Sequence, residues 1–411
     1  MTTLAPDPST SLRRQRSFVM FWCARVAATS AFQMQAVAVG WQIYDLTGSA
    51  LDLGLVGLVQ FVPVVALALV VGHVADRYDR RRVVRVAQFV EAAAAVGLAV
   101  GSAAAWLDIR AIFAIVLVAG TARAFELPTM HALVPGLVPG HLFSRAVAGS
   151  TSANQAAVVL GPAVGGLLYA ASPAAVYLAC TALFLAASML ITMVRIDAPA
   201  RSRQPFSLVS LFAGFAYIRS RRELVGVISL DLCAVLLGGA IALLPIYARD
   251  ILRVGPEGLG MLRSAPAVGA LASSILLSRH PLQRRVGPIL FSAVACFGAA
   301  TAVFAVSTSV ALSLAALALC GASDAVSVVI RFSLVQTRTP SEMRGRVSSV
   351  NSLFVGASNT LGDFEAGLTA AWFGAVPAVL IGGIGAVLVA LIWMRIFPEL
   401  AAIETLDGRS Q

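Results

Sequence analysis

The sequence predicts an all-α membrane protein with 12 transmembrane helices in two six-helix bundles and both termini in the cytoplasm. Three observations support this: an apolar composition, recurring long apolar runs, and arginines that alternate between loops. Of the 411 residues, 59% are hydrophobic and 12% are charged, and the mean hydropathy is +0.87. Because soluble domains carry about 25% charged residues, the composition argues against a soluble enzyme, a nucleic-acid binder and a disordered protein.

A helix needs about 20 apolar residues to cross a bilayer, and helix is the expected form because lipid offers no partner for free backbone groups. A polar stretch near the middle of the chain predicts a cytoplasmic linker (197–222) between an N-terminal bundle (1–196) and a C-terminal bundle (223–411). In chain order, the expected spans are 18–44, 50–74, 84–105, 110–131, 142–170, 174–195, 223–248, 257–278, 287–306, 308–335, 346–372 and 375–397.

The distribution of arginine sets the expected orientation. All 30 basic residues are arginine; 23 of them lie in the termini and one alternating set of loops, and three lie in the opposite loops. Cytoplasmic loops carry the excess of basic residues, so both termini are expected inside. The net charge of +10 therefore indicates topology and contact with lipid phosphates rather than nucleic-acid binding.

An internal repeat relates the two halves. A shift of 201 residues aligns Arg123 with Asp324 and Arg145 with Arg346, and it aligns the fifth span with the eleventh. Parallel repeats of this kind are typical of transporters whose substrate site lies between the halves near the bilayer midplane.

Three sequence motifs carry a family resemblance. The loop after the second span, Gly72 to Arg81, reads Gly-His-Val-Ala-Asp-Arg-Tyr-Asp-Arg-Arg, and the fifth span contains Gly161-Pro162-x-x-Gly165-Gly166. In the second half, Val335 to Val347 is followed by Asn359-Thr360-Leu361-Gly362-Asp363. Through these residues the chain resembles the major facilitator superfamily and, within it, the branch of the enterobactin (siderophore) exporters.

The resemblance implies roles for the first two motifs. The loop, in which Asp79 stands where the family usually has glycine, is expected to form a cytoplasmic gate against the start of the eleventh span. The alternative is that its arginines fix topology alone. The small residues of the fifth span predict close helix packing, and the resemblance implies a bias toward export. The gate residues are Gly72, Asp76, Arg77, Arg80 and Arg81, and the packing motif is Gly161, Pro162, Gly165 and Gly166.

Ionisable residues inside the spans are the sharpest functional candidates, because each costs several kcal/mol unless it is paired or faces a cavity. Arg123 and Glu126 stand at i and i+3 and are expected to pair. The resemblance implies that spans 1, 4, 7 and 10 line a central cavity, and Asp363 is expected toward its exit. The predicted substrate-cavity residues are Arg25, Gln33, Arg123, Arg331 and Asp363; the other charged residues within spans are Glu91, Glu126, Asp231, Arg263, Asp324 and Glu365.

Proton coupling requires a carboxyl group whose surroundings change its protonation. Asp231 is the first candidate, because its own span offers no arginine within reach. Glu126 and Asp324 follow, since a same-helix arginine would hold each one ionised. The alternative for any of the three is a static salt bridge between helices.

The sequence therefore predicts a secondary active transporter that exports a small amphipathic organic molecule, a siderophore or a drug, by proton-coupled alternating access. A lysolipid flippase and a metabolite importer are alternatives, and a non-transporting membrane sensor or scaffold is the alternative from another class. No catalytic residues, cofactor or metal site are expected, since nucleophile–base pairs, metal-ligand spacing and a nucleotide-binding loop are not found. The expected partners are substrate, protons and lipid, without nucleic acid, for a monomer in the bacterial cytoplasmic (inner) membrane.

Overall fold

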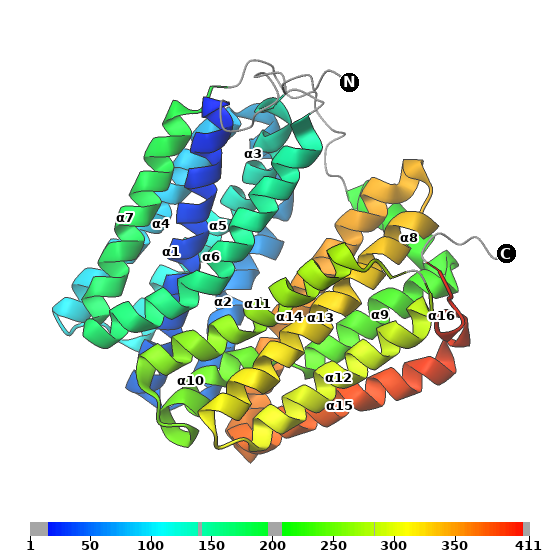
Figure 1. Cartoon of the computed structure of the whole chain (residues 1–411). Coiled ribbons are helices and arrows are strands. Elements are labelled where there is room, and N and C mark those ends of the chain that lie inside the picture. The colour runs from blue at the N-terminus through cyan, green and yellow to red at the C-terminus, as the bar shows by residue number, and fades with distance from the viewer. Residues whose placement is uncertain (1–14, 139–141, 196–207, 283, 406–411) are drawn as a thin grey trace, which may run out of the picture. The chain divides into compact units, whose positions relative to one another are not determined.

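The computed structural model describes residues 15–138, 142–195, 208–282 and 284–405, and in these ranges the chain forms helices joined by turns, with no β-strand (Figure 1). The contacts divide the chain into two compact units. Unit 1 comprises Met1–Val39 and Val62–Pro205, and unit 2 comprises Gly40–Phe61 and Phe206–Gln411. The division falls inside the first two helices, so the chain passes between the units more than once.

The described residues of the first half of the chain form seven α-helices, with one 3₁₀ turn between the fifth and the sixth. Their bounds are α1 (Arg16–Thr47), α2 (Ala50–Ala66), α3 (Ala68–Arg77), α4 (Arg80–Ala103), α5 (Ile109–Leu133), η3 (Val134–Gly136), α6 (Phe143–Ala171) and α7 (Pro173–Met193). In unit 1, α4 packs between α5 and α7.

The second half is helical to its described end. In unit 2, α12 packs against α13 and α15, α13 packs against α11, and α9 packs against α14 and α15. The bounds are α8 (Leu208–Ser220), α9 (Arg222–Leu237), η5 (Ala240–Leu243), α10 (Leu244–Ile246), η6 (Tyr247–Ile251), α11 (Gly255–Arg279), α12 (Val286–Val306), α13 (Val310–Arg338), α14 (Ser341–Phe373), α15 (Ala375–Ile396) and α16 (Pro398–Ala401).

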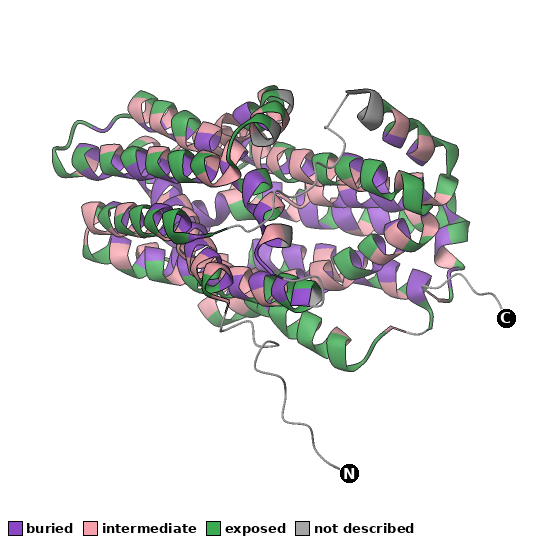
Figure 2. Ribbon diagram, turned by 90° about the horizontal axis from the view of Figure 1, so that it is seen from above, coloured by how far each residue is buried: buried purple, intermediate pink, exposed green. Residues whose placement is uncertain are grey.

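Within the described ranges, nine helical segments are long and apolar enough to cross a membrane. The remaining expected spans correspond to α1 and α14, which are 32 and 33 residues long but more polar, and to the shorter α2 with α3. Many large apolar side chains are exposed on the helices, among them Trp372 (70%), Met189 (64%) and Leu160 (61%). In Figure 2 exposed and buried residues alternate along each helix. Such apolar exposure is typical of a lipid-facing surface.

Two expected spans are interrupted rather than continuous. The span expected at 50–74 is divided at Leu67 into α2 and α3. The Leu67 N–H still donates to the Pro63 carbonyl oxygen and the Val71 N–H to that of Leu67, so helical hydrogen bonds lie on both sides of the division. The span expected at 223–248 ends as α9 at Leu237, and η5, the short α10 and the π-helical turn η6 replace its C-terminal part. The break coincides with Gly238-Gly239, a pair of residues with low helix propensity.

The expected linker 197–222 is only partly described, since 196–207 lies outside the described residues. Its second part forms α8, which packs against α14 in unit 2. Gly214 makes this approach possible, because a Cβ at this position would lie 2.8 Å from the Arg346 carbonyl oxygen.

The glycines of the fifth expected span lie where α6 meets α1 in unit 1. A Cβ added to Gly165 would lie 2.7 Å from the Met34 Cα, and one added to Gly161 would lie 2.8 Å from the Gln33 Cβ. The predicted close packing is thus present in the structure at these two positions. Small residues allow such backbone approach between membrane helices, where packing rather than the hydrophobic effect holds helices together.

We expect Gly165→Ala to destabilise unit 1, because its methyl group meets the backbone of Met34 rather than a flexible side-chain end. Overpacking of this kind costs about 1–3 kcal/mol. The midpoint of thermal unfolding in detergent should fall by several degrees. Gly149→Ala is the control on the same helix, since nothing lies within 4 Å of its added Cβ. Equal midpoints for the two variants would contradict the close contact.

Candidate functional site

A polar cluster lies inside unit 1, between α4 and α5. The Arg123 guanidinium pairs with the Glu126 carboxylate one turn away, which confirms the expected pairing at i and i+3. The other carboxylate oxygen of Glu126 accepts a hydrogen bond of 2.9 Å from the Gln88 side-chain amide of α4. Glu126 is 1% exposed and Gln88 is fully buried, so this network lies away from the surface of the protein.

Arg25 and Thr29 of α1 stand one helical turn apart and make polar contacts with α6 in the same unit. Arg25 donates to the Ser150 hydroxyl at 3.0 Å, and Thr29 donates to the Asn154 side-chain oxygen at 3.0 Å. The Arg123 guanidinium stacks 4.4 Å from the centre of the Phe32 ring, a favourable cation–π arrangement. The structure thus brings together two of the predicted cavity residues, Arg25 and Arg123, whose charges interact. Gln33 instead packs against Gly161.

Glu91 of α4 is a member of this cluster to which sequence reasoning assigned no role. It is 2% exposed, and neither carboxylate oxygen has a hydrogen-bond partner. Its charged neighbours are Glu126 and Arg123. The available signal was the placement of Gln88 and Glu91 at i and i+3 inside an apolar run, which puts both on one helix face.

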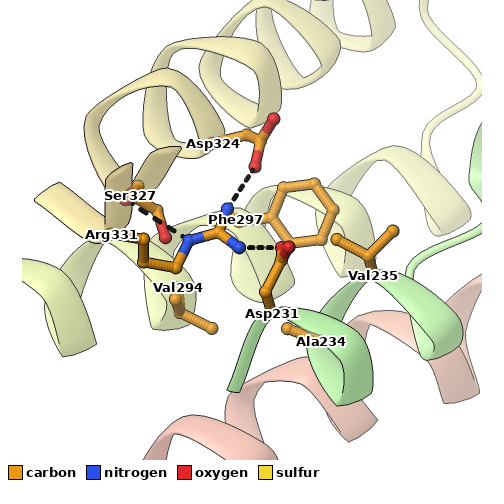
Figure 3. Close-up of a pocket in the computed structure, with 8 residues that line it drawn as sticks. All are labelled: Asp231, Ala234, Val235, Val294, Phe297, Asp324, Ser327 and Arg331. Atoms are coloured by element: carbon orange, nitrogen blue, oxygen red, sulfur yellow. Dashed lines mark hydrogen bonds and ion pairs between the residues drawn. The ribbon is translucent and has the colours of Figure 1, made fainter. Parts of the chain in front are cut away.

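The second polar cluster lies inside unit 2, where α9 meets α13 (Figure 3). Arg331 pairs with Asp231 across the two helices and also lies 3.6 Å from the Asp324 carboxylate. Its Nε donates to the Ser327 carbonyl oxygen at 3.3 Å. One arginine therefore serves two acids, and the side chains of Asp231 and Arg331 are about nine-tenths buried whereas that of Asp324 is 47% exposed.

The surroundings of Asp231 differ from those expected from its own span. The absence of an arginine in its own span suggested a carboxyl group isolated among apolar side chains, but Arg331 reaches it from α13. Asp231 and Asp324 are thus paired with the same guanidinium. The pairing could not be read from helix periodicity, because it joins residues 100 positions apart on different helices.

The pocket around Arg331 is too small for an organic ligand. It is lined by the three charged side chains together with Ser327, Phe297 and three small apolar residues. Its free volume is about 10 Å³, close to the smallest that holds one water molecule. In this conformation the site accommodates a proton or a water molecule.

Asp363 of α14 lies beside the break that ends α9. Its carboxylate accepts a hydrogen bond from the backbone N–H of Ala242 in η5, and its charge interacts with that of Arg263 on α11. The interrupted helix therefore supplies a backbone donor that a continuous helix would have used internally. Small residues pack beside this site, where a Cβ on Gly54 would lie 3.1 Å from the Asp363 carbonyl oxygen.

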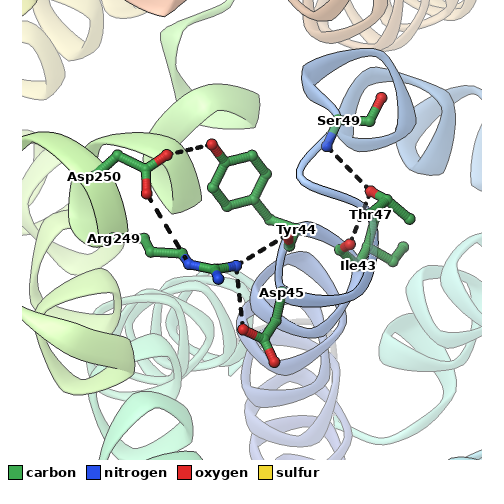
Figure 4. A network of polar contacts seen from close by, with 7 residues as sticks. All are labelled: Ile43, Tyr44, Asp45, Thr47, Ser49, Arg249 and Asp250. Carbon is green, nitrogen blue, oxygen red and sulfur yellow. Dashed lines mark hydrogen bonds and ion pairs between the residues drawn. The ribbon is translucent and has the colours of Figure 1, made fainter.

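Another polar network, also in unit 2, joins the end of α1 to η6 (Figure 4). The Tyr44 hydroxyl donates to the Asp250 carboxylate, and Arg249 pairs with Asp45 at 3.1 Å. Arg249 also donates to the Tyr44 carbonyl oxygen at 3.2 Å. From the sequence, Arg249 is expected to be an ordinary loop arginine, because the π-helical turn that directs its side chain toward α1 has no sequence pattern of its own.

In the segment from Gly72 to Arg81, here called the signature loop, two arginines bind helix ends within unit 1. Arg80 donates to the Ala132 carbonyl oxygen at 2.9 Å, and Arg81 donates to the Val194 carbonyl oxygen at 3.0 Å. Both carbonyls lie at C-terminal helix ends, where cations are favourable. Arg77 is exposed, Gly72 is half-buried, and the side chain of Asp76 lies outside the described residues.

Asp79 replaces the family's usual glycine and acts as the N-cap of α4. Its φ is −58°, so the turn does not require glycine, and its side chain accepts from the Arg81 backbone N–H at 3.0 Å. The hydrogen bond from the Arg81 guanidinium lowers the pKa of Asp79 below its usual value. The same contact raises the pKa of Arg81.

Among the described residues, no group of three or more histidine, cysteine, aspartate or glutamate side chains is arranged to hold a metal ion. The paired charges and hydrogen bonds of the two units can bind a charged ligand, exchange one partner for another, or hold a proton.

Comparison with known proteins gives a consistent result. The profile of a family described as transmembrane secretion effector matches residues 7–411. The enterobactin exporter EntS of Salmonella choleraesuis is 28% identical over 383 residues, which cover 92% of this chain and 87% of that protein. The enterobactin exporter EntS of Escherichia coli O1:K1 is 28% identical over 382 residues with the same coverage.

Solved structures of transporters share the fold. A bacterial homologue of the iron transporter ferroportin, in an inward-facing state, has a TM-score of 0.73 at 17% identity, covering 96% of this chain and all of that one. The nucleoside transporter NupG has a TM-score of 0.71 at 14% identity, covering 93% of this chain and 99% of that one. At such identities the likeness establishes the fold and leaves the substrate undetermined.

We expect Arg331→Gln to destabilise unit 2, because Asp231 would lose its cation while remaining buried. Breaking a buried pair in this way costs about 3–5 kcal/mol. The thermal midpoint should fall accordingly, and adding Asp231→Asn to the same chain should restore part of it. Arg338→Gln is the control: its pair with Glu223 is one-third exposed or more on both sides and is worth at most about 1 kcal/mol. Equal losses from both arginine variants would contradict the assignment.

Proposed function

The chain belongs to the transmembrane secretion effector family, and from this premise we propose that it exports a small amphipathic organic molecule, of the siderophore class, across the bacterial cytoplasmic membrane in exchange for protons. As a multi-pass transporter of the major facilitator type it is not an enzyme. The observation that carries the proposal is the 28% identity to enterobactin exporters over 92% of the chain. The relatives suggest the direction of transport and the class of substrate.

The proposed topology has 12 spans, with six in 1–196, six in 223–411, and both termini cytoplasmic. The alternating arginine distribution supports it. The polar character of α1 and α14 also fits, because helices that line an aqueous pathway need not be apolar on every face. Transport then proceeds by rocking of the two bundles around a site near the midplane.

The proposed cavity residues are Arg25, Gln33, Arg123, Arg331 and Asp363. Buried charges in membrane helices are costly and mark substrate or ion pathways. Two of the arginines, Arg123 and Arg331, are each paired with an acid on the same unit. An arginine that exchanges its acid for an anionic group of a substrate keeps its charge compensated throughout the exchange.

The proposed proton carriers are Asp231 and Asp324, with Glu126 as the corresponding acid in unit 1. One guanidinium faces both aspartates, so it cannot fully neutralise both carboxylates. A proton on one of the two aspartates balances the charge of the site. When Arg331 moves toward that aspartate, the guanidinium compensates its carboxylate, which can then lose the proton.

We expect Asp231→Asn to abolish transport driven by a pH gradient, because the amide cannot exchange a proton. The measurement is enterobactin uptake into inside-out vesicles with an imposed gradient, acidic inside. Counterflow exchange without a gradient should survive, which separates loss of coupling from loss of folding. An unchanged response to the gradient would remove Asp231 from the proposal. Transport of a lysolipid or a cationic dye in place of enterobactin would indicate a different class of substrate. If none of these compounds is transported, a sensor or scaffold would be favoured.

The signature loop is proposed as the cytoplasmic gate, with Asp76 as its central residue beside Gly72, Arg77, Arg80 and Arg81. We expect Asp76→Asn to insert and fold normally but to reduce transport at least tenfold, because the lost carboxylate no longer stabilises the inward-closed state. Arg82→Gln, in the same loop, is the control for loss of one charge. The measurement is initial uptake rate per inserted protein, and full activity of the Asp76 variant would exclude the gate.

A further inference from the structure

Glu91 is a buried acidic residue in unit 1 whose carboxylate makes no hydrogen bond. The residue lies near the middle of α4 and is 2% exposed, and both of its carboxylate oxygens lack a hydrogen-bond partner. Burying an ionised carboxylate without a partner is among the most costly arrangements in a protein, and such a group neutralises itself instead. Membrane lipid around the bundle offers no water to reduce this cost.

The side-chain amide of Gln88 has a buried acceptor without a donor. Glu126 is accepting hydrogen bonds, so the Gln88 amide must turn its NH₂ group toward it, at 2.9 Å. Its carbonyl oxygen Oε1 is thereby directed elsewhere, and it is buried without a donor. Gln88 and Glu91 stand three positions apart on α4, where side chains share one helix face.

A single proton satisfies both residues. A neutral Glu91 carries an O–H group, which is a donor that an ionised carboxylate lacks, and the Gln88 Oε1 is an acceptor without a donor. We propose that Glu91 is a protonated carboxyl group that donates to Gln88, and that Glu91 and Glu126 together form a proton-binding site in unit 1, separate from the Asp231 cluster of unit 2. The transport consequence alone rests on the proposed function.

The charged groups near Glu91 come from α5 and, through them, from α1. On α5, Glu126 and Arg123 are its charged neighbours, and they already compensate each other. On α7, the titratable groups are Tyr177 and Cys180, which are uncharged. α3 precedes α4 directly in the chain, and Arg80, the first residue of α4, lies roughly 16 Å along the helix from Glu91 at 1.5 Å per residue. Arg25 of α1 interacts with Arg123 and Glu126, so these three residues carry one net positive charge when Glu91 is neutral. That charge favours an ionised Glu91, whereas burial without a hydrogen-bond partner favours the neutral form.

Release of this proton would change the partner of Arg123. The Arg123 Nε is buried without a hydrogen-bond partner, so the guanidinium has a donor to offer to a second carboxylate. An ionised Glu91 therefore competes with Glu126 for Arg123, whose ring contact with Phe32 at 4.4 Å links it to α1. The proton on Glu91 thus controls an ion pair within the bundle, and the structure assigns to unit 1 a proton-responsive element of its own.

Infrared difference spectroscopy on the purified full-length protein at pH 7 tests the protonation directly. The expected result is a band of a protonated carboxyl group that disappears in Glu91→Gln and remains in Asp231→Asn. Gln88→Met should shift the same band to higher wavenumber, because the carboxyl group loses its acceptor; this second variant serves if Glu91→Gln does not fold. A spectrum that neither variant changes overturns the proposal.

This readout needs neither substrate nor gradient, so it separates the inference from the proposed function. A Glu91 band in a protein that ignores pH gradients would support the inference while contradicting proton-coupled export. Gradient-driven export with no Glu91 band would do the reverse. In vesicles, Glu91→Gln is expected to reduce gradient-driven enterobactin uptake at least fivefold.

Discussion

The cost of placing charge away from water governs the structure of this protein. Each ionisable side chain in an apolar helix must find a counter-charge, a hydrogen-bond partner or a proton. In unit 2 the solution is one arginine shared by two acids, Arg331 with Asp231 and Asp324. In unit 1 it is the Arg123–Glu126 pair with Gln88 as an additional donor. Each solution leaves one acid incompletely balanced, and these acids are the proton sites that we propose.

Close helix packing makes these solutions possible. Gly161 and Gly165 let α6 approach α1 at Gln33 and Met34, and this approach brings Ser150 and Asn154 of α6 to the polar face of α1. In unit 2, the break after Leu237 frees the Ala242 N–H for Asp363. Interruption and close contact both weaken an isolated helix, but here they supply the polar partners that buried charges require.

The signature loop shows how one set of residues can serve stability and function together. Arg80 and Arg81 bind carbonyl groups at the ends of α5 and α7, and Asp79 caps α4. These contacts lie within unit 1 and exist whether or not the loop also acts as a gate. Removing Arg80 or Arg81 would disturb packing whatever the role of the loop in transport, so the proposed gate is tested at Asp76 with a matched control.

The sequence by itself determined the helical membrane class, the positions of most spans, the pairing of Arg123 with Glu126 and the packing role of Gly161 and Gly165. These follow from local properties: apolar length, spacing along one helix, and side-chain size. Only the tertiary structure decided that Arg331 reaches Asp231 and that Arg249 and Tyr44 join one network with Asp250. It also decided that the Glu91 carboxylate is buried near the Arg123–Glu126 pair without a hydrogen bond of its own. Each of these depends on which faces of separate helices meet, and a helical repeat fixes the face of a residue without fixing the neighbour that this face contacts.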